Sequence, residues 1–110
     1  MIALVGLPGS GKSTVGRQLA RRLQLPFMDS DHAIEAQIGC SILEYFEREG
    51  EDRFRDAEEA VIDQLTQQQL GVLATGGGAV LRAVNRQHLR ERTQVVYLSS
   101  SPDELFRRLR

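Results

Sequence analysis

The amino-acid sequence predicts an α/β protein in which a parallel sheet is covered by helices on both faces. Two observations lead to this fold class. Short apolar runs of strand length alternate along the chain with longer segments whose apolar residues recur at helical spacing. A glycine-rich segment also follows the first apolar run directly, as expected where a buried parallel strand passes into a ligand-binding loop. The 110 residues are enough for one small domain of this class.

The elements follow in order along the chain. Four strands are predicted, at residues 2–5, 26–29, 71–75 and 94–98. Helices are predicted between them, at residues 13–23, 31–37, 41–49, 51–69 and 83–91. No strand pattern interrupts residues 31–69, so we expect a helical insertion there that serves as a substrate-binding subdomain. One more helix begins near Pro102 and reaches Arg110 without a stop signal, so we expect the domain to be incomplete at its C-terminus.

Residues 6–13, Gly-Leu-Pro-Gly-Ser-Gly-Lys-Ser, match the phosphate-binding pattern G-x-x-x-x-G-K-[ST]. Glycines let the backbone turn successive N–H groups towards phosphate oxygens. Lys12 can reach the β- and γ-phosphates, the Ser13 hydroxyl can ligate Mg²⁺, and the following helix points its positive end at the anion. A dinucleotide-binding fingerprint is excluded because Thr14 occupies its third glycine position. The sequence therefore predicts a nucleoside triphosphate site formed by Gly9, Ser10, Gly11, Lys12, Ser13 and Thr14.

Two aspartates, Asp29 and Asp31, close the second predicted strand. Ligands of open parallel sheets bind beyond the carboxyl ends of the strands, and residues two apart on a strand point the same way. One carboxylate can then hold hydrated Mg²⁺ beside Ser13 while the other faces an acceptor hydroxyl. Asp29 is the best-placed metal ligand, because the third predicted strand ends in glycine instead of an acid. The alternative is helix capping, with Ser30 or Asp31 as the N-cap of the next helix.

Two further segments carry candidate substrate contacts. Gly76, Gly77 and Gly78 follow the third strand and let a ligand approach the backbone closely, although a flexible turn is the alternative. In the helix that starts at residue 51, Arg55 and Glu58 share a face. An arginine held by one carboxylate can grip a second one bidentately. The alternative is an ordinary solvent-exposed charged face.

Charge and composition limit the partners. The 14 basic and 15 acidic residues leave a net charge of −1, which gives no field for nucleic acid. The single cysteine excludes an intramolecular disulfide, and no segment has the length of a membrane span or a signal peptide. A basic helix face is expected to be solvated; it consists of Arg82, Arg86, Arg90 and Arg92.

Taken together, these segments resemble the shikimate kinase family over essentially the whole chain. The phosphate loop alone is generic, whereas its combination with Asp-x-Asp, Phe-Arg-x-x-Glu and a triple glycine is specific. The resemblance is carried by Gly-Leu-Pro-Gly-Ser-Gly-Lys-Ser-Thr, Phe27-Met28-Asp29-Ser30-Asp31, Gly50-Glu51, Phe54-Arg55, Glu58, Leu73-Ala74-Thr75-Gly76-Gly77-Gly78-Ala79-Val80 and Val95-Val96-Tyr97-Leu98.

The resemblance implies a three-layer P-loop NTPase fold of the nucleoside monophosphate kinase type. It also implies a cytoplasmic, monomeric enzyme that uses ATP and Mg²⁺ to phosphorylate the 3-hydroxyl of shikimate in aromatic amino-acid biosynthesis. The implied roles are charge neutralisation by Lys12, substrate hydroxyl binding and base catalysis by Asp31, carboxylate binding by Arg55, orientation of Arg55 by Glu58, pocket lining by Gly76, Gly77 and Gly78, Mg²⁺ binding by Ser13 and Asp29, and adenine stacking by Arg108.

The family continues beyond this point with a lid, two further arginines, a last strand and a helix. Because these parts are missing from the 110 residues, we expect the fragment alone to be weakly active or inactive. Two alternatives stay open. One is another small-molecule kinase of the same superfamily, such as gluconate kinase, and the other is a non-catalytic module that binds nucleotide or shikimate.

Overall fold

The computed structural model describes residues 1–6 and 11–98 and contains one parallel sheet with the strand order β2-β3-β1-β4. Its strands are β1 (Ile2–Gly6), β2 (Phe27–Asp29), β3 (Val72–Ala74) and β4 (Gln94–Leu98). Its helices are α1 (Lys12–Leu23), α2 (Ser30–Ile38), α3 (Ile42–Glu49), α4 (Glu51–Leu65) and α5 (Ala83–Arg92). The carboxyl ends of β1, β2 and β3 therefore meet at one edge of the sheet, where the loops that follow them can share a ligand.

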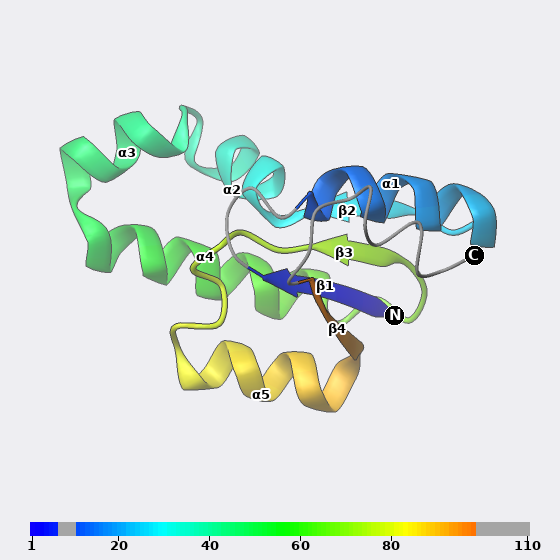
Figure 1. The fold of residues 1–110 in the computed structure, drawn as a ribbon. Coiled ribbons are helices and arrows are strands. Elements are labelled where there is room, and N and C mark those ends of the chain that lie inside the picture. The colour runs from blue at the N-terminus through cyan, green and yellow to red at the C-terminus, as the bar shows by residue number, and fades with distance from the viewer. Residues whose placement is uncertain (7–10, 99–110) are drawn as a thin grey trace.

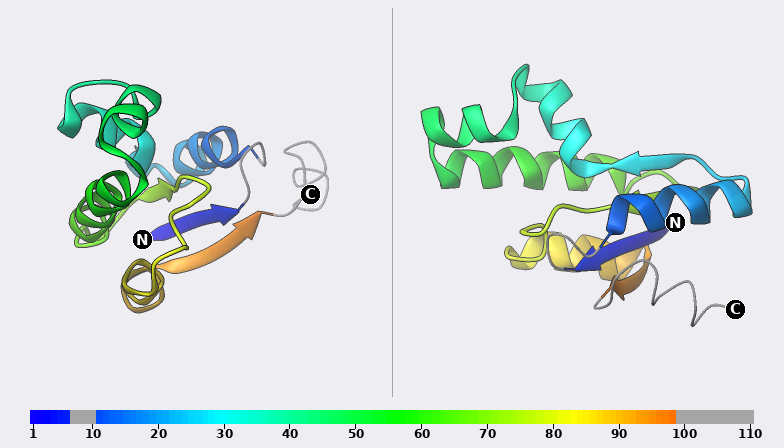
Figure 2. Two further views of the ribbon diagram at one scale, coloured as in Figure 1. Left: turned by 90° about the vertical axis from the view of Figure 1, so that its left-hand side faces the viewer. Right: turned by 45° about the horizontal axis from the view of Figure 1, so that its top comes forward.

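Helices cover both faces of the sheet, as the sequence predicts (Figures 1 and 2). Side chains alternate along β1, so Leu4 packs with Val15 and Ala20 of α1 on one face. Ala3 and Val5 pack with Leu89 of α5 on the opposite face. Both clusters are buried, and together they hold the strands between two helical layers.

The insertion between β2 and β3 forms a helical arm with a core of its own. Figure 1 shows α3 at the far end of the arm, with α2 and α4 connecting it to the sheet. Ile34 of α2 packs against Phe54 and Val61 of α4, and Ile42 and Tyr45 of α3 cover this cluster. The arm therefore carries its own side chains to the sheet edge on packed helices.

Most predicted boundaries are confirmed within one residue, and one helix is clearly shorter than predicted. The helix expected over residues 51–69 ends at Leu65. The Thr66 hydroxyl donates to the carbonyl of Ile62 at 2.7 Å and lies 3.2 Å from that of Asp63, which occupies acceptors at the helix end. Arg92 of α5 also donates to the Asp63 carbonyl. These tertiary contacts end the helix where residue preference alone continues it.

The basic face of α5 also differs from the expectation of a solvated surface. Arg90 is exposed, but Arg82 and Arg92 form ion pairs with α4, and Arg86 donates to backbone carbonyls. Within the described ranges 1–6 and 11–98, no helix combines the length and apolar character needed to cross a bilayer.

Candidate active site

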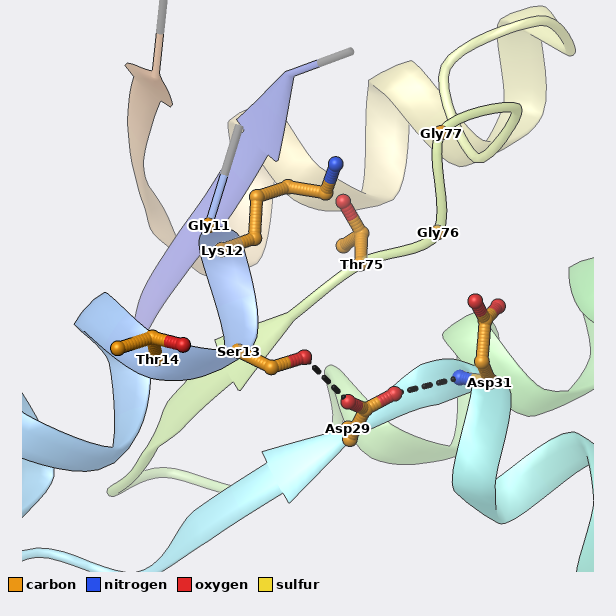
Figure 3. A pocket seen from close by; sticks show the side chains of 9 residues that line it. All are labelled: Gly11, Lys12, Ser13, Thr14, Asp29, Asp31, Thr75, Gly76 and Gly77. Atoms are coloured by element: carbon orange, nitrogen blue, oxygen red, sulfur yellow. Dashed lines mark hydrogen bonds between the residues drawn. The ribbon is translucent and has the colours of Figure 1, made fainter. Parts of the chain in front are cut away.

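A pocket of about 370 Å³ opens at the carboxyl ends of the central strands (Figure 3). It is bounded by the start of α1, the β2–α2 junction and the turn after β3. The lining residues are Gly11, Lys12, Ser13, Thr14, Asp29, Asp31, Thr75, Gly76 and Gly77. Most of the predicted site residues are thus brought together, while Gly9, Ser10 and Arg108 lie outside the described residues.

The N-terminus of α1 is built to face an anion. Its N-cap is Gly11, which adopts the left-handed conformation (φ 84°) that favours glycine and offers no side chain to cap the first N–H groups. Lys12 is nearly buried and its Nζ donates to the carbonyl of Gly6 at 2.8 Å. Burial lowers the pKa of Lys12, whereas the carboxylates of Asp31 and Asp29 raise it. A lysine held among these carboxylates can turn its charge towards an incoming phosphate.

Asp29 connects the phosphate-binding helix to the arm. Its Oδ2 accepts a hydrogen bond from the Ser13 hydroxyl at 2.7 Å. Its Oδ1 accepts from the backbone N–H groups of Asp31 at 3.0 Å and His32 at 3.3 Å, which makes Asp29 the N-cap of α2. Capping is therefore real, but it falls on Asp29 and not on Ser30 or Asp31.

The expectation that β2 runs through both aspartates is wrong. The strand ends at Asp29, and Asp31 lies in the first turn of α2. Once the cap starts the helix, the two carboxylates no longer share a strand face. Asp29 instead lies against Ser13, and the Asp31 carboxylate faces the turn after β3 (Figure 3).

The donor set of Ser13 and Asp29 fits Mg²⁺. A hydroxyl and a carboxylate oxygen lie 2.7 Å apart beside Lys12, and both are hard oxygen ligands. Across the described residues, no group of three or more His, Cys, Asp or Glu side chains could hold a metal ion by itself. Mg²⁺ commonly binds through one or two protein oxygens, with water and phosphate completing its shell.

Asp31 occupies a half-buried position. Burial is the main reason that its pKa is raised, and the neighbouring carboxylates of Asp29 and Glu35 raise it further, while Lys12 and Arg55 lower it. The turn after β3 packs directly on this side chain, since a Cβ on Gly76 would overlap the carboxylate. A glycine is required there because of this close approach, not because of an unusual φ angle.

Arg55 and Glu58 form a largely buried ion pair on α4. Arg55 Nη1 donates to Glu58 Oε1 at 3.0 Å, and the side chains are 18% and 2% exposed. Burial raises the pKa of Glu58 although the Arg55 hydrogen bond lowers it. A Cβ on Gly78 would overlap the Arg55 guanidinium. The alternative of an ordinary solvated charged face is therefore wrong for this pair.

Two residues in this region were not singled out from the sequence. Ser30 is fully buried, and its hydroxyl accepts a hydrogen bond from the Gly76 N–H at 3.1 Å. Thr75 lines the pocket, and its hydroxyl donates to the Leu4 carbonyl at 2.8 Å. Their positions, between two aspartates and before three glycines, were the only available sequence signal.

The fold and the site define a P-loop α/β protein of the small-molecule kinase type: a parallel strand, a glycine-rich loop with Lys12 and Ser13, and a helical arm at the same edge of the sheet. A model of the family described as shikimate kinase matches residues 8–110. The chain therefore belongs to the shikimate kinase family, and the predicted recognition and fold class are confirmed.

Curated relatives agree with this assignment. Shikimate kinase of Paracidovorax citrulli is 64% identical over 111 residues, covering 99% of this chain and 61% of the relative. Shikimate kinase of Ralstonia nicotianae is 56% identical, covering 99% of this chain and 57% of the relative. The chain thus spans about 60% of the length of these relatives.

Solved structures show the same fold. Shikimate kinase from Acinetobacter baumannii in complex with shikimate superposes with a TM-score of 0.88 and 52% identity, covering 94% of this chain and 57% of that one. Shikimate kinase from Aquifex aeolicus gives a TM-score of 0.84 at 37% identity, covering 96% and 62%. A gluconokinase from Sinorhizobium meliloti, with a TM-score of 0.52 and 23% identity, covers 87% of this chain and 54% of that one and shows a likeness of fold alone.

Proposed function

We propose that the full-length protein containing this chain transfers the γ-phosphoryl group of ATP to the 3-hydroxyl of shikimate. The observation that carries this proposal is the arrangement at the sheet edge. The Ser13–Asp29 pair lies on the phosphate side of Asp31, and the Arg55–Glu58 pair lies on its other side, against the glycine turn. Membership of the shikimate kinase family and a similar structure described as a complex with shikimate support it.

On the phosphate side, the first turn of α1 and Lys12 receive the triphosphate. Gly11, Ser13 and Thr14 line this part of the pocket. Ser13 and Asp29 would hold Mg²⁺, which neutralises charge on the phosphate oxygens when it is bound. Gly9 and Ser10 complete the loop, and Arg108 is proposed to stack on adenine.

On the acceptor side, Asp31 orients the 3-hydroxyl and accepts its proton during transfer. Phosphoryl transfer depends mostly on positioning and electrostatics, so a carboxylate within reach of the hydroxyl contributes alignment as well as basicity. Its raised pKa follows chiefly from burial, which makes its proton affinity higher than that of an exposed aspartate. Exclusion of water from this side strengthens both effects.

Recognition of the substrate carboxylate falls to Arg55. Glu58 fixes one edge of the guanidinium and leaves other N–H groups for a ligand. The backbone of Gly76, Gly77 and Gly78 supplies a wall without side chains beside Asp31 and Arg55. The helical arm of residues 31–69 thereby acts as the substrate-binding subdomain of a single P-loop kinase domain.

The test is substrate-dependent release of ADP by the full-length protein with Mg²⁺ and ATP. We expect turnover with shikimate and none with gluconate, because the two acids present different hydroxyl geometry to Asp31. Turnover with gluconate instead would assign the other kinase class. Tight shikimate and ATP binding without any turnover would assign a non-catalytic binding module.

A further inference from the structure

Arg82 makes a three-point contact between the segment after the glycine turn and the helical arm. It is the N-cap residue of α5, and its side chain crosses to α4. Arg82 Nη1 lies 2.7 Å from Asp56 Oδ1 and 3.4 Å from Glu59 Oε1. Its Nη2 donates to the carbonyl of Asp52 at 3.4 Å. The three acceptors occupy successive turns on one face of α4, so a single guanidinium fixes the turn segment along that helix.

The turn segment itself is tied to α5. The buried Asn85 side chain donates to the Ala79 carbonyl at 3.0 Å. Arg86 Nη1 donates to the carbonyls of Val80 at 2.7 Å and Leu81 at 3.1 Å. Three successive carbonyls after the glycine turn are thus held by α5 side chains. A displacement of the N-terminus of α5 therefore carries the turn with it.

The same stretch of α4 carries the substrate-facing ion pair. Arg55 precedes Asp56 and Glu58 precedes Glu59, so the contacts of Arg82 flank the pair on the adjacent helix face. The backbone of Gly78 packs on the Arg55 guanidinium without room for a Cβ. The gap between the turn and Arg55 is therefore set by how firmly α5 is held on α4.

We propose that Arg82 is a positioning residue that sets the spacing between the glycine turn and Arg55, and thereby the affinity for the acceptor's carboxylate. This inference rests on the proposed function. The glycine turn has no side chains of its own, and its internal bonds are Ala79 N–H to Gly76 O and Leu81 N–H to Gly78 O, both 3.1 Å. Residues that touch no ligand can change binding when they fix such a spacing.

Arg92 provides a matched control at the opposite end of α5. Its Nη1 lies 2.7 Å from Asp63 Oδ1 of α4, the same distance as in the Arg82–Asp56 pair, and both arginine side chains are 31% exposed. Both therefore tether α5 to α4 with similar contacts. Only Arg82 lies next to the glycine turn and the Arg55–Glu58 pair.

The experiment compares Arg82→Met with Arg92→Met in the full-length protein. We expect both variants to lower Tm by similar amounts, because each loses a partly exposed tether. Only Arg82→Met should raise KM and Kd for shikimate, by about three- to thirtyfold, with KM for ATP unchanged. Arg82→Lys should recover part of the affinity, because an ammonium group can still pair with Asp56 or Glu59. In an Arg55→Ala background, Arg82→Met should add less than about a twofold loss, because its effect passes through Arg55.

Equal shikimate affinities of Arg82→Met and Arg92→Met would overturn the positioning role while leaving the proposed function intact. So would a full additive loss in the Arg55→Ala background. A wild-type protein without shikimate-dependent turnover or binding would overturn both proposals. Should Arg82→Met fail to fold, Arg82→Lys decides the question, with an unchanged KM for shikimate counting against the inference.

Discussion

The two sides of the pocket are built in different ways. On the phosphate side, the described contributors come from one stretch of residues 11–14 and from Asp29, which the Ser13 hydroxyl contacts directly. On the acceptor side, Asp31, Arg55 and Gly78 come from α2, α4 and the turn after β3. The first group is nearly continuous in sequence, whereas the second is assembled only by tertiary packing.

This difference separates generic from selective chemistry. A loop and a helix N-terminus bind phosphate in many proteins, and their geometry is fixed locally. The acceptor side depends on the buried Glu58 carboxylate, whose charge is tolerated because Arg55 pairs with it. Selectivity for one acceptor is therefore located where the structure depends most on long-range contacts.

The largest expected effect breaks the phosphate side alone. Lys12→Ala in the full-length protein should abolish measurable turnover, because Lys12 neutralises charge on the transferred phosphoryl group. Shikimate affinity should stay close to that of the wild type, since Arg55 and Glu58 are untouched. Steady-state assays and calorimetry on folded protein measure both quantities. A near-normal kcat would contradict the role of Lys12.

The next effect falls at the boundary between the two sides. Asp31→Asn keeps the size of the side chain and leaves the cap at Asp29 intact, but it removes the base. We expect kcat to fall by roughly 10²–10⁴-fold. Tm and ATP affinity should change little. If the variant keeps more than about a tenth of the wild-type kcat, Asp31 does not act as the base.

A third prediction breaks the acceptor side alone. Arg55→Ala removes the carboxylate partner and leaves Glu58 buried without its hydrogen-bond donor. Loss of one partner from a buried charged pair costs roughly 2–5 kcal/mol, so shikimate Kd should rise by about thirtyfold or more. ATP affinity should be unchanged. Calorimetry tests this directly, and an unaltered shikimate Kd would mean that Arg55 only stabilises the arm.

The smallest effect concerns pH. Asp31 acts as a base in its charged form, and its pKa is raised above the ordinary value of 3.8, so kcat/KM for shikimate should fall as pH drops through that raised pKa. Glu35 is one of the carboxylates that raise it. Glu35→Gln should therefore move the acid limb of the profile to lower pH. The exposed Glu47→Gln on α3 serves as the control and should leave the limb in place; an upward shift with Glu35→Gln would contradict this electrostatic assignment.

The local features of this chain could be predicted from its sequence, and the features that depend on packing could not. The strand, loop and helix around Lys12 follow from a contiguous pattern, and the Arg55–Glu58 pair follows from helical spacing. The cap at Asp29 was assigned to its neighbours, because the end of a three-residue strand depends on sheet pairing.

The tethers between α4 and α5 were not predicted either. Arg82 contacts Asp56, and Arg92 contacts Asp63, across separations that residue spacing does not reveal. The same contacts explain why α4 ends at Leu65, before the end of its helical pattern. Burial at the site was equally hidden, because Glu58 resembles any surface glutamate until the arm folds over it.

The central place of β3 in the sheet also constrains how the chain can assemble during synthesis. Ile2 and Phe27 both pair with Val72, so β1 and β2 are joined only through a strand that the ribosome makes much later. Until then both early strands expose unpaired edges, which can associate with other nascent chains. Parallel pairing at such separation is slow, because loop closure precedes any gain from contact. Nucleotide and acceptor can therefore meet in one pocket only after residues 72–74 have entered the sheet.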